Sequence, residues 1–117
     1  MKVYISIPIA GRDIAAQRNF AANVAKSLAK SGHEPLNPFC NGLPEDAPRH
    51  EHMLKDLRML LRCDAIVLCP GWERSEGCLL ECSVAKQCGL RIAYADLPVD
   101  KILMQLDTSD LQKGGRQ

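Results

Sequence analysis

The stretch DAIVLCPGWERSEGCLLECSVA, residues 64–85, carries most of the information about the fold. Its first part, residues 64–69, is an apolar run typical of a strand that is buried on both faces. A turn with two glycines follows, and residues 77–88 have the spacing of a helix. A strand, a turn and a helix in this order form the unit of a parallel α/β sheet.

The rest of the chain repeats this alternation. Further strands are predicted at residues 2–7, 33–37 and 90–94, and further helices at 14–30, 53–62 and 98–106. Asp13 is predicted to cap the first helix, and residues 37–52, rich in Pro, Gly and Asn, are predicted to form a loop. This order predicts the α/β class, as a Rossmann-like three-layer sandwich with a central, mainly parallel sheet of four to five strands.

Length and charge limit the classes of function. A chain of 117 residues suits one core, so we predict a single domain at residues 1–107 and a flexible C-terminal tail at 108–117. A net charge of +1, with no block of like charges, argues against a nucleic acid polymer as partner. The apolar run near the N-terminus is too short for a membrane span or a signal peptide. We therefore expect a cytoplasmic protein with no membrane partner.

The six cysteines are predicted to be reduced thiols that act as small apolar residues. Their spacings include no C-x-x-C pair, which argues against a zinc site. One alternative is a tetrahedral set in which Cys78 and Cys82 are completed by His50 and His52. Our expectation is that the protein holds no metal and needs no cofactor.

Glu81 is the most informative polar residue, because its predicted helix places it on the inward face. On a helical wheel it shares an arc with Cys78, Cys82 and Ala85. A carboxylate there must face a cavity, pair with a cation or accept hydrogen bonds, since burial without a partner is costly. The alternative is a solvated or salt-bridged Glu near a helix start. Ligands of parallel α/β sheets bind where strands end and helices begin, which favours a ligand site at Glu81.

A second carboxylate, Asp56, borders the apolar stripe of the 53–62 helix. Two carboxylates facing one crevice is the arrangement that breaks a glycosidic bond through a cationic sugar transition state. In the loop before Glu81, Ser75 is suited to cap the helix, and Gly77 lets backbone amides approach a ligand. The same loop holds Trp72, the only Trp, which could cap the pocket or stack on a base.

The end of the first predicted strand should face the same crevice. Ser6, Gly11 and Arg12 lie there, and Arg12 could pair with a phosphate or an acidic partner. The glycine pattern is neither a dinucleotide-binding fingerprint nor a P-loop.

Three blocks carry a family resemblance: VYISIPIAGR, KDLRMLLRCDAIVLC and SEGCLLECSVA. Over residues 2–95 the chain resembles the nucleoside 2-deoxyribosyltransferase-like superfamily, which includes transferases and small deoxynucleoside monophosphate N-glycosidases. The most specific match is the S-x-G-x-x-x-E pattern of Ser75, Gly77 and Glu81. The chain departs from the family at Ile7, where Gly is frequent, and at Pro8, where the monophosphate hydrolases have a phosphate-binding Ser.

The resemblance implies a role for each matched residue. Glu81 would be the nucleophile that forms a covalent deoxyribosyl intermediate. Asp56 would hold the sugar and take part in proton transfer to the base. Ser75 and Gly77 would contact a 5′-phosphate or 5′-hydroxyl. Tyr4 and Ser6 would line the side where the base is expected.

On this basis the expected function is cleavage or transfer of the N-glycosidic bond of a deoxyribonucleoside or its 5′-monophosphate. The partner would be a small-molecule nucleoside or nucleotide. The resemblance also implies a homodimer or a higher homo-oligomer, with residues 38–52 and the C-terminal segment as contact regions. Two alternatives stay open: a non-catalytic nucleotide-binding or sensor domain of the same fold, and a thiol-rich metal-binding or redox protein.

Overall fold

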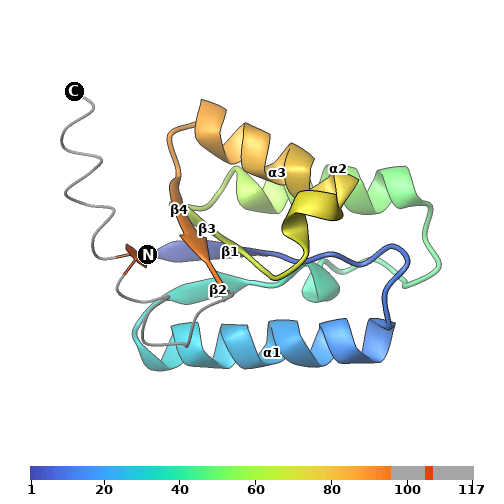
Figure 1. The fold of residues 1–117 in the computed structure, drawn as a ribbon, viewed down its shortest axis with the longest axis horizontal. Helices are drawn as coiled ribbons and strands as arrows, with labels where there is room; N and C mark the ends of the chain where they lie inside the picture. Colours follow the sequence, from blue (N-terminus) through green and yellow to red (C-terminus); the bar gives the residue numbers. More distant parts are fainter. Residues whose placement is uncertain (96–104, 107–117) are drawn as a thin grey trace.

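A computed structural model gives the protein a parallel α/β architecture (Figure 1). It describes residues 1–95 and 105–106. The strands are β1 (Lys2–Ser6), β2 (Glu34–Leu36), β3 (Ala65–Leu68) and β4 (Arg91–Tyr94). Over the described residues these four strands form one sheet in the order β2-β1-β3-β4, and every neighbouring pair is parallel. The predicted fold class is confirmed, with β1 and β3 at the centre of the sheet.

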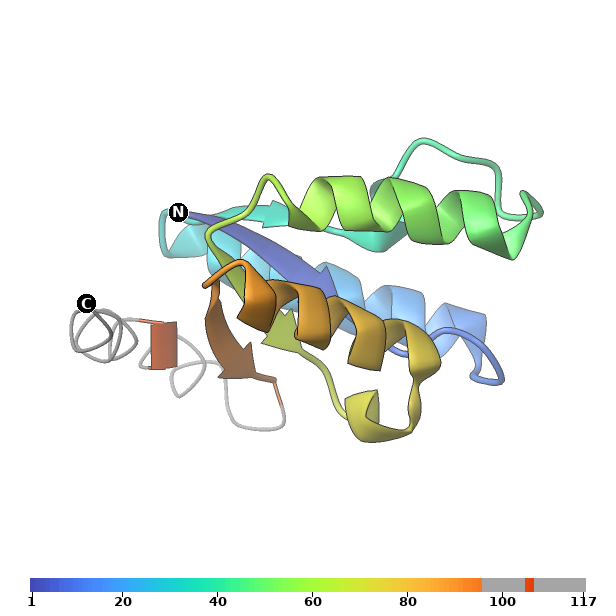
Figure 2. The same ribbon diagram turned by 90° about the horizontal axis from the view of Figure 1, so that it is seen from above.

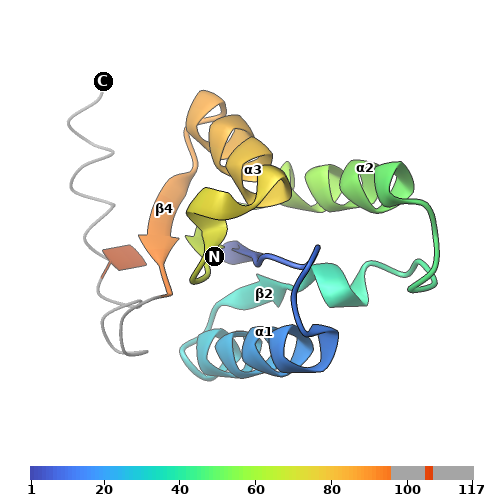
Figure 3. The ribbon, with the colours of Figure 1, turned by 45° about the vertical axis from the view of Figure 1, so that its right-hand side comes forward.

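Helices cover both faces of the sheet. α1 (Ile14–Lys30) lies on one face, and α2 (Arg49–Leu60) and α3 (Glu76–Gln87) lie side by side on the other (Figures 2 and 3). Two short 3₁₀ turns, η1 (Pro38–Cys40) and η2 (Trp72–Arg74), precede α2 and α3. Each parallel connection needs such a crossover, which is why strands and helices alternate along the chain.

The alternation of side chains along β1 assigns its residues to the two faces. Val3 and Ile5 pack in the core cluster beneath α1, whereas Tyr4 packs in the cluster between the sheet and the other two helices. Successive side chains of a strand point to opposite faces, so Ser6 lies on the same side as Tyr4. β1 therefore presents two hydroxyl groups to the face that α3 covers.

Polar caps fix the starts of two helices, as predicted. Asp13 accepts a hydrogen bond from the backbone N–H of Ala16 at 3.3 Å, which caps α1. Ser75 Oγ accepts from the backbone N–H of Cys78 at 3.2 Å, which caps α3. Both side chains satisfy a backbone donor that the helix leaves without a partner.

The predicted start of α2 was wrong. The helix begins at Arg49, after Pro48, rather than at residue 53. Its first turn is polar and exposed, so hydrophobic spacing carries no signal there. The 37–52 segment also contains η1 and is therefore only partly a loop.

Two predictions for the C-terminal part of the chain fall mostly or wholly outside the described residues. Most of the predicted 98–106 helix and the whole predicted tail at 108–117 lie outside them; Gln105 and Leu106 are helical.

All six cysteines are free, and four of them are buried. No helix of the described segments has the length and apolar character needed to cross a membrane.

Two neighbouring leucines provide a test of this packing. Leu60 is fully buried between α2 and the sheet, whereas the next residue, Leu61, is 58% exposed. Leu60→Ala should lower the free energy of unfolding by about 2 to 5 kcal/mol, because it leaves a cavity in the core. Leu61→Ala should change it by less than about 0.5 kcal/mol. Urea denaturation measures both, and equal losses would contradict the assigned packing.

Candidate active site

Glu81 is held at both carboxylate oxygens by hydroxyl groups of β1. Tyr4 donates its hydroxyl hydrogen to Glu81 Oε2 at 2.6 Å, and Ser6 donates to Oε1 at 2.7 Å. The two donors alternate along β1 and so share one face, over which α3 lays Glu81. Short bonds to an ionised acceptor are among the stronger hydrogen bonds in proteins, so they fix the orientation of the carboxylate.

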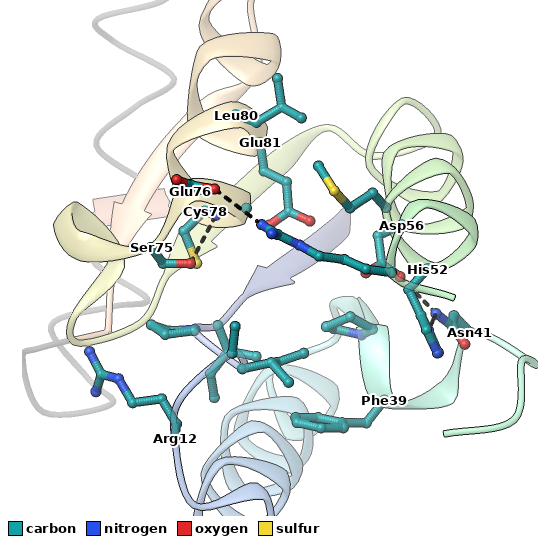
Figure 4. Close-up of a pocket in the computed structure, with 18 of the residues that line it drawn as sticks. Arg12, Phe39, Asn41, His52, Asp56, Ser75, Glu76, Cys78, Leu80 and Glu81 are labelled. Atoms are coloured by element: carbon teal, nitrogen blue, oxygen red, sulfur yellow. Dashed lines mark hydrogen bonds and ion pairs between the residues drawn. The ribbon is translucent and has the colours of Figure 1, made fainter. Parts of the chain in front are cut away.

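A cavity of about 840 Å³ opens in front of this carboxylate (Figure 4). Most of its wall comes from the segments that follow β1, β2 and β3, together with α2. This is the usual place for a ligand in a parallel α/β sheet. Its polar and charged lining residues are Arg12, Arg18, Asn41, Glu45, Arg49, His52, Asp56, Arg74, Ser75, Glu76 and Glu81.

The surroundings of Glu81 place its ionisation near neutral pH. Burial raises the pKa of its carboxyl to about 7, the hydrogen bonds from Tyr4 and Ser6 act in the opposite direction, and the charge of Asp56 raises it further. Burial, with the charge of Glu81 next in size, also raises the pKa of Tyr4 well above its ordinary value. The Tyr4 phenol therefore keeps its hydrogen and remains a donor to Glu81.

Asp56 faces the same cavity from α2 (Figure 4). Burial raises the pKa of its carboxyl, and a hydrogen bond from Asn41 and the proximity of His52 lower it. Asn41 Nδ2 donates to Asp56 Oδ1 at 2.9 Å. The two carboxyl groups thus share one cavity, and the charge of Asp56 raises the pKa of Glu81.

The cavity brings together most of the predicted site residues. Glu81, Asp56, Arg12, Ser75 and Gly77 all line it. Tyr4 and Ser6 contribute through their bonds to Glu81, although they were predicted on the side of the base.

Two predicted residues lie elsewhere. Gly11 is not part of the cavity wall that the described residues form; it allows the turn after β1 with a φ of 73°. Trp72 also lies outside that wall, and its ring packs against Tyr94 with centroids 5.9 Å apart. η2 thus places the indole against Tyr94, the last residue of β4.

Asn41 and two ion pairs at the cavity wall were not predicted from the sequence. Arg18 and Glu45 approach to 3.7 Å, and Arg49 and Glu76 approach to 3.5 Å. The Asn-Gly dipeptide at residues 41–42 is a turn signal, but nothing in it announces a contact with Asp56. The ion pairs join segments far apart in the chain and have no local signature.

Arg12 reaches the cavity past a glycine. Gly71 has a φ of 88°, and a Cβ placed there would lie 3.1 Å from the Arg12 Cζ atom, so the backbone of the loop before η2 leaves room for the guanidinium. The cationic group and the start of α3 are both able to approach an anionic or polar end of a ligand.

The alternative zinc set is not assembled. No group of three or more His, Cys, Asp or Glu side chains in the described part of the chain lies close enough to hold a metal ion. His52, one of the proposed ligands, instead contacts Asn41 and the carbonyl of Pro44, each at 3.0 Å.

Residues 1–94 match the sequence model of a family described as a domain of unknown function, DUF4406. The chain belongs to the DUF4406 family. None of the curated proteins compared with this DUF4406 chain matches it in sequence.

Solved structures with the same fold include 2-deoxyribosyltransferases and an N-glycosidase. A 2-deoxyribosyltransferase from Bacillus psychrosaccharolyticus aligns over 80% of this chain and 71% of its own, with a TM-score of 0.64 and 19% identity. A 2-deoxyribosyltransferase from Leishmania mexicana aligns over 80% and 62%, with a TM-score of 0.61 and 22% identity. A CMP N-glycosidase from Clostridium botulinum aligns over 80% and 70%, with a TM-score of 0.58 and 18% identity. This DUF4406 protein therefore has a nucleoside 2-deoxyribosyltransferase-like fold, as predicted.

The raised pKa of the buried Glu81 carboxyl predicts how the free energy of unfolding depends on pH. A Glu whose pKa is about 7 in the folded protein, against an ordinary 4.5, binds its proton more tightly when folded. Its contribution to stability is therefore largest below pH 4.5 and is lost as pH rises through 7. The Glu81→Gln variant has no carboxyl at this position and so does not lose stability in this way. The free energy of unfolding of the variant minus that of wild type should therefore increase by about 2 to 3 kcal/mol from pH 5 to pH 8. Urea denaturation at both pH values measures this difference, and parallel curves for the two proteins would contradict the burial of the charge.

Proposed function

We propose that the protein breaks the N-glycosidic bond of a deoxyribonucleoside or a deoxyribonucleoside 5′-monophosphate, with Glu81 as the nucleophile. The observation that carries this proposal is a carboxylate held at both oxygens by Tyr4 and Ser6 and directed into a cavity that a second carboxyl group, Asp56, also lines. The fold that the chain shares with 2-deoxyribosyltransferases and a CMP N-glycosidase supports it.

In the first step an oxygen of ionised Glu81 attacks C1′ of the sugar. The C1′–N bond breaks, its electron pair passes to the base, and protonated Asp56 gives a proton to that base. The product is a deoxyribosyl ester of Glu81 and a free nucleobase. Tyr4 and Ser6 orient the attacking carboxylate so that it needs no reorganisation when the sugar is bound.

In the second step a water molecule attacks C1′ from the face that the base has left. Asp56, now ionised, takes the proton of the water, and the bond between C1′ and Glu81 breaks to restore the carboxylate. Two inversions at C1′ give net retention. A second nucleobase in place of water would give base exchange; we favour hydrolysis because the domain is small and Ser75 is suited to hold a phosphate.

The start of α3 is the proposed site for the 5′ end of the sugar. Ser75, Gly77 and Arg12 line the cavity there, where helix amides and a guanidinium favour a hydroxyl or phosphate oxygen. Pro8, which also lines the cavity, has no side-chain donor for a phosphate. Because this loop departs from the monophosphate hydrolases and fold does not fix activity, a second candidate function is a nucleotide-binding or sensor domain without catalysis.

The two candidates differ in what happens to the substrate. Purified protein is incubated with the four deoxyribonucleoside monophosphates and the free deoxyribonucleosides, and released base is measured by chromatography. Wild type should release base from at least one, and Glu81→Ala should lower that rate by about 1,000-fold or more while it still binds the substrate. Intact substrates together with a nucleotide-dependent rise in melting temperature would instead identify a sensor.

The pH dependence of base release tests the pairing of Glu81 with Tyr4. Attack on C1′ needs the ionised form of Glu81, so kcat/KM should rise with pH through a limb near pH 7 that comes from the Glu81 carboxyl. Tyr4→Phe removes a hydrogen bond that lowers the pKa of Glu81, so this limb should move to higher pH.

The matched control is Tyr94→Phe, which deletes a phenol oxygen at the end of β4, against Trp72. This variant should keep the wild-type profile. If the limb of the kcat/KM profile stays at the same pH in Tyr4→Phe, the hydrogen bond does not control the ionisation of Glu81.

A further inference from the structure

A single side chain, Asn41, links the segment between β2 and α2 to the proposed acid. Asn41 is 5% exposed and follows η1. Its Nδ2 donates to Asp56 Oδ1 at 2.9 Å and lies 3.0 Å from His52 Nδ1, while its Oδ1 accepts from the backbone N–H of Leu43 at 3.0 Å (Figure 4). These contacts occupy both hydrogens of the amide, so its orientation follows from the network.

His52 fixes the second hydrogen of that amide. Its Nε2 lies 3.0 Å from the carbonyl oxygen of Pro44, which can only accept, so Nε2 carries the proton and donates. In the neutral ring Nδ1 is then an acceptor, and it receives the second N–H of Asn41. The N–H of His52 and both N–H groups of the Asn41 amide therefore each have their own acceptor.

The donation by Asn41 decides which oxygen of Asp56 carries the proton. The carbonyl oxygen of a neutral carboxyl accepts hydrogen bonds better than its hydroxyl oxygen, so an N–H donated to Oδ1 at 2.9 Å stabilises the form whose proton lies on Oδ2. Within the described residues Oδ2 has no hydrogen-bond partner, and Asp56 lines the cavity. We infer that Asn41, held by His52, is a positioning residue that keeps the Asp56 proton on the oxygen open to the leaving base; the inference rests on the proposed function.

This role predicts that the importance of Asn41 depends on the leaving group. An ordinary purine must receive a proton as the C1′–N bond breaks, and Asp56 Oδ2 supplies it. A purine methylated at N7 already carries a positive charge. It takes up the electron pair of the broken bond and departs as a neutral molecule without a proton. Loss of the positioning residue should therefore slow release of the first base and spare the second.

Asn41→Asp is the test variant, because it keeps an oxygen for the Leu43 N–H and loses the N–H that Asp56 receives. Release of guanine from 2′-deoxyguanosine should fall by about 10- to 100-fold. Release from N7-methyl-2′-deoxyguanosine should stay within about threefold of wild type. Equal losses for both substrates, or no loss for either, would overturn the inference, because a structural role does not distinguish leaving groups.

Asn37→Ala is the matched control. Asn37 Oδ1 accepts from the backbone N–H of Phe39 at 3.0 Å, in the same kind of turn that Asn41 makes with Leu43, and its side chain has no hydrogen bond to Asp56. This variant should change release of both substrates by less than about threefold. A loss confined to 2′-deoxyguanosine in Asn37→Ala would assign the effect to the loop rather than to Asn41 and would overturn the inference.

A measurement without turnover separates this inference from the proposed function. The pKa of Asp56 is followed by NMR of its ¹³C-labelled carboxyl carbon in wild type, Asn41→Leu and Asn37→Ala. The hydrogen bond from Asn41 lowers this pKa, so Asn41→Leu should raise it, while Asn37→Ala should leave it in place. An unchanged value in Asn41→Leu overturns the positioning role. Absence of base release by wild type contradicts the proposed function alone.

Discussion

The hydrogen bonds from Tyr4 and Ser6 to Glu81 are the interaction on which the candidate site depends. They cross from the central strand β1 to α3, so they require the parallel sheet, the crossover that places α3 over β1, and the strand alternation that puts both hydroxyls on one face. The Ser75 cap fixes where α3 begins and therefore which of its residues faces β1. Without these constraints a carboxylate among small apolar side chains would have no partner.

The same interaction explains why Glu81 favours the proposed reaction at the expense of the stability of the fold. Burial raises the pKa of Glu81 to about 7, and the two hydroxyl groups offset part of that effect. A carboxyl poised near neutral pH is poorly suited to stabilising a fold, but it suits a group that must be charged in one step of a reaction and neutral in the next. The charge of Asp56 raises the pKa of Glu81 further, and burial raises the pKa of Asp56 itself. Perturbed carboxyl pairs of this kind are typical of functional sites.

Local sequence predicted much of the fold and part of the site, for reasons that particular residues make clear. The apolar run at 64–69 and the helical spacing after it could be read from the sequence because burial on both faces leaves a continuous hydrophobic pattern. Ser75 and Asp13 could be predicted as caps because capping depends on a few neighbouring residues. Glu81 could be predicted to face inward, since helical periodicity fixes its side, but its partners on β1 lie more than seventy residues away. The link from Asn41 to Asp56 depends on how the intervening loop folds back, and the direction of Trp72 depends on where β4 ends, so neither had a local signal.

The ionisation of Glu81 can be measured directly. The protein is labelled with ¹³C at the glutamate carboxyl carbons, the Glu81 resonance is assigned with the Glu81→Gln variant, and its chemical shift is followed from acidic to alkaline pH. We expect a midpoint of about 7. A midpoint near the ordinary value of 4.5 would mean that the carboxylate is solvated like a surface residue, and it would contradict the buried, hydrogen-bonded charge on which the proposed chemistry rests.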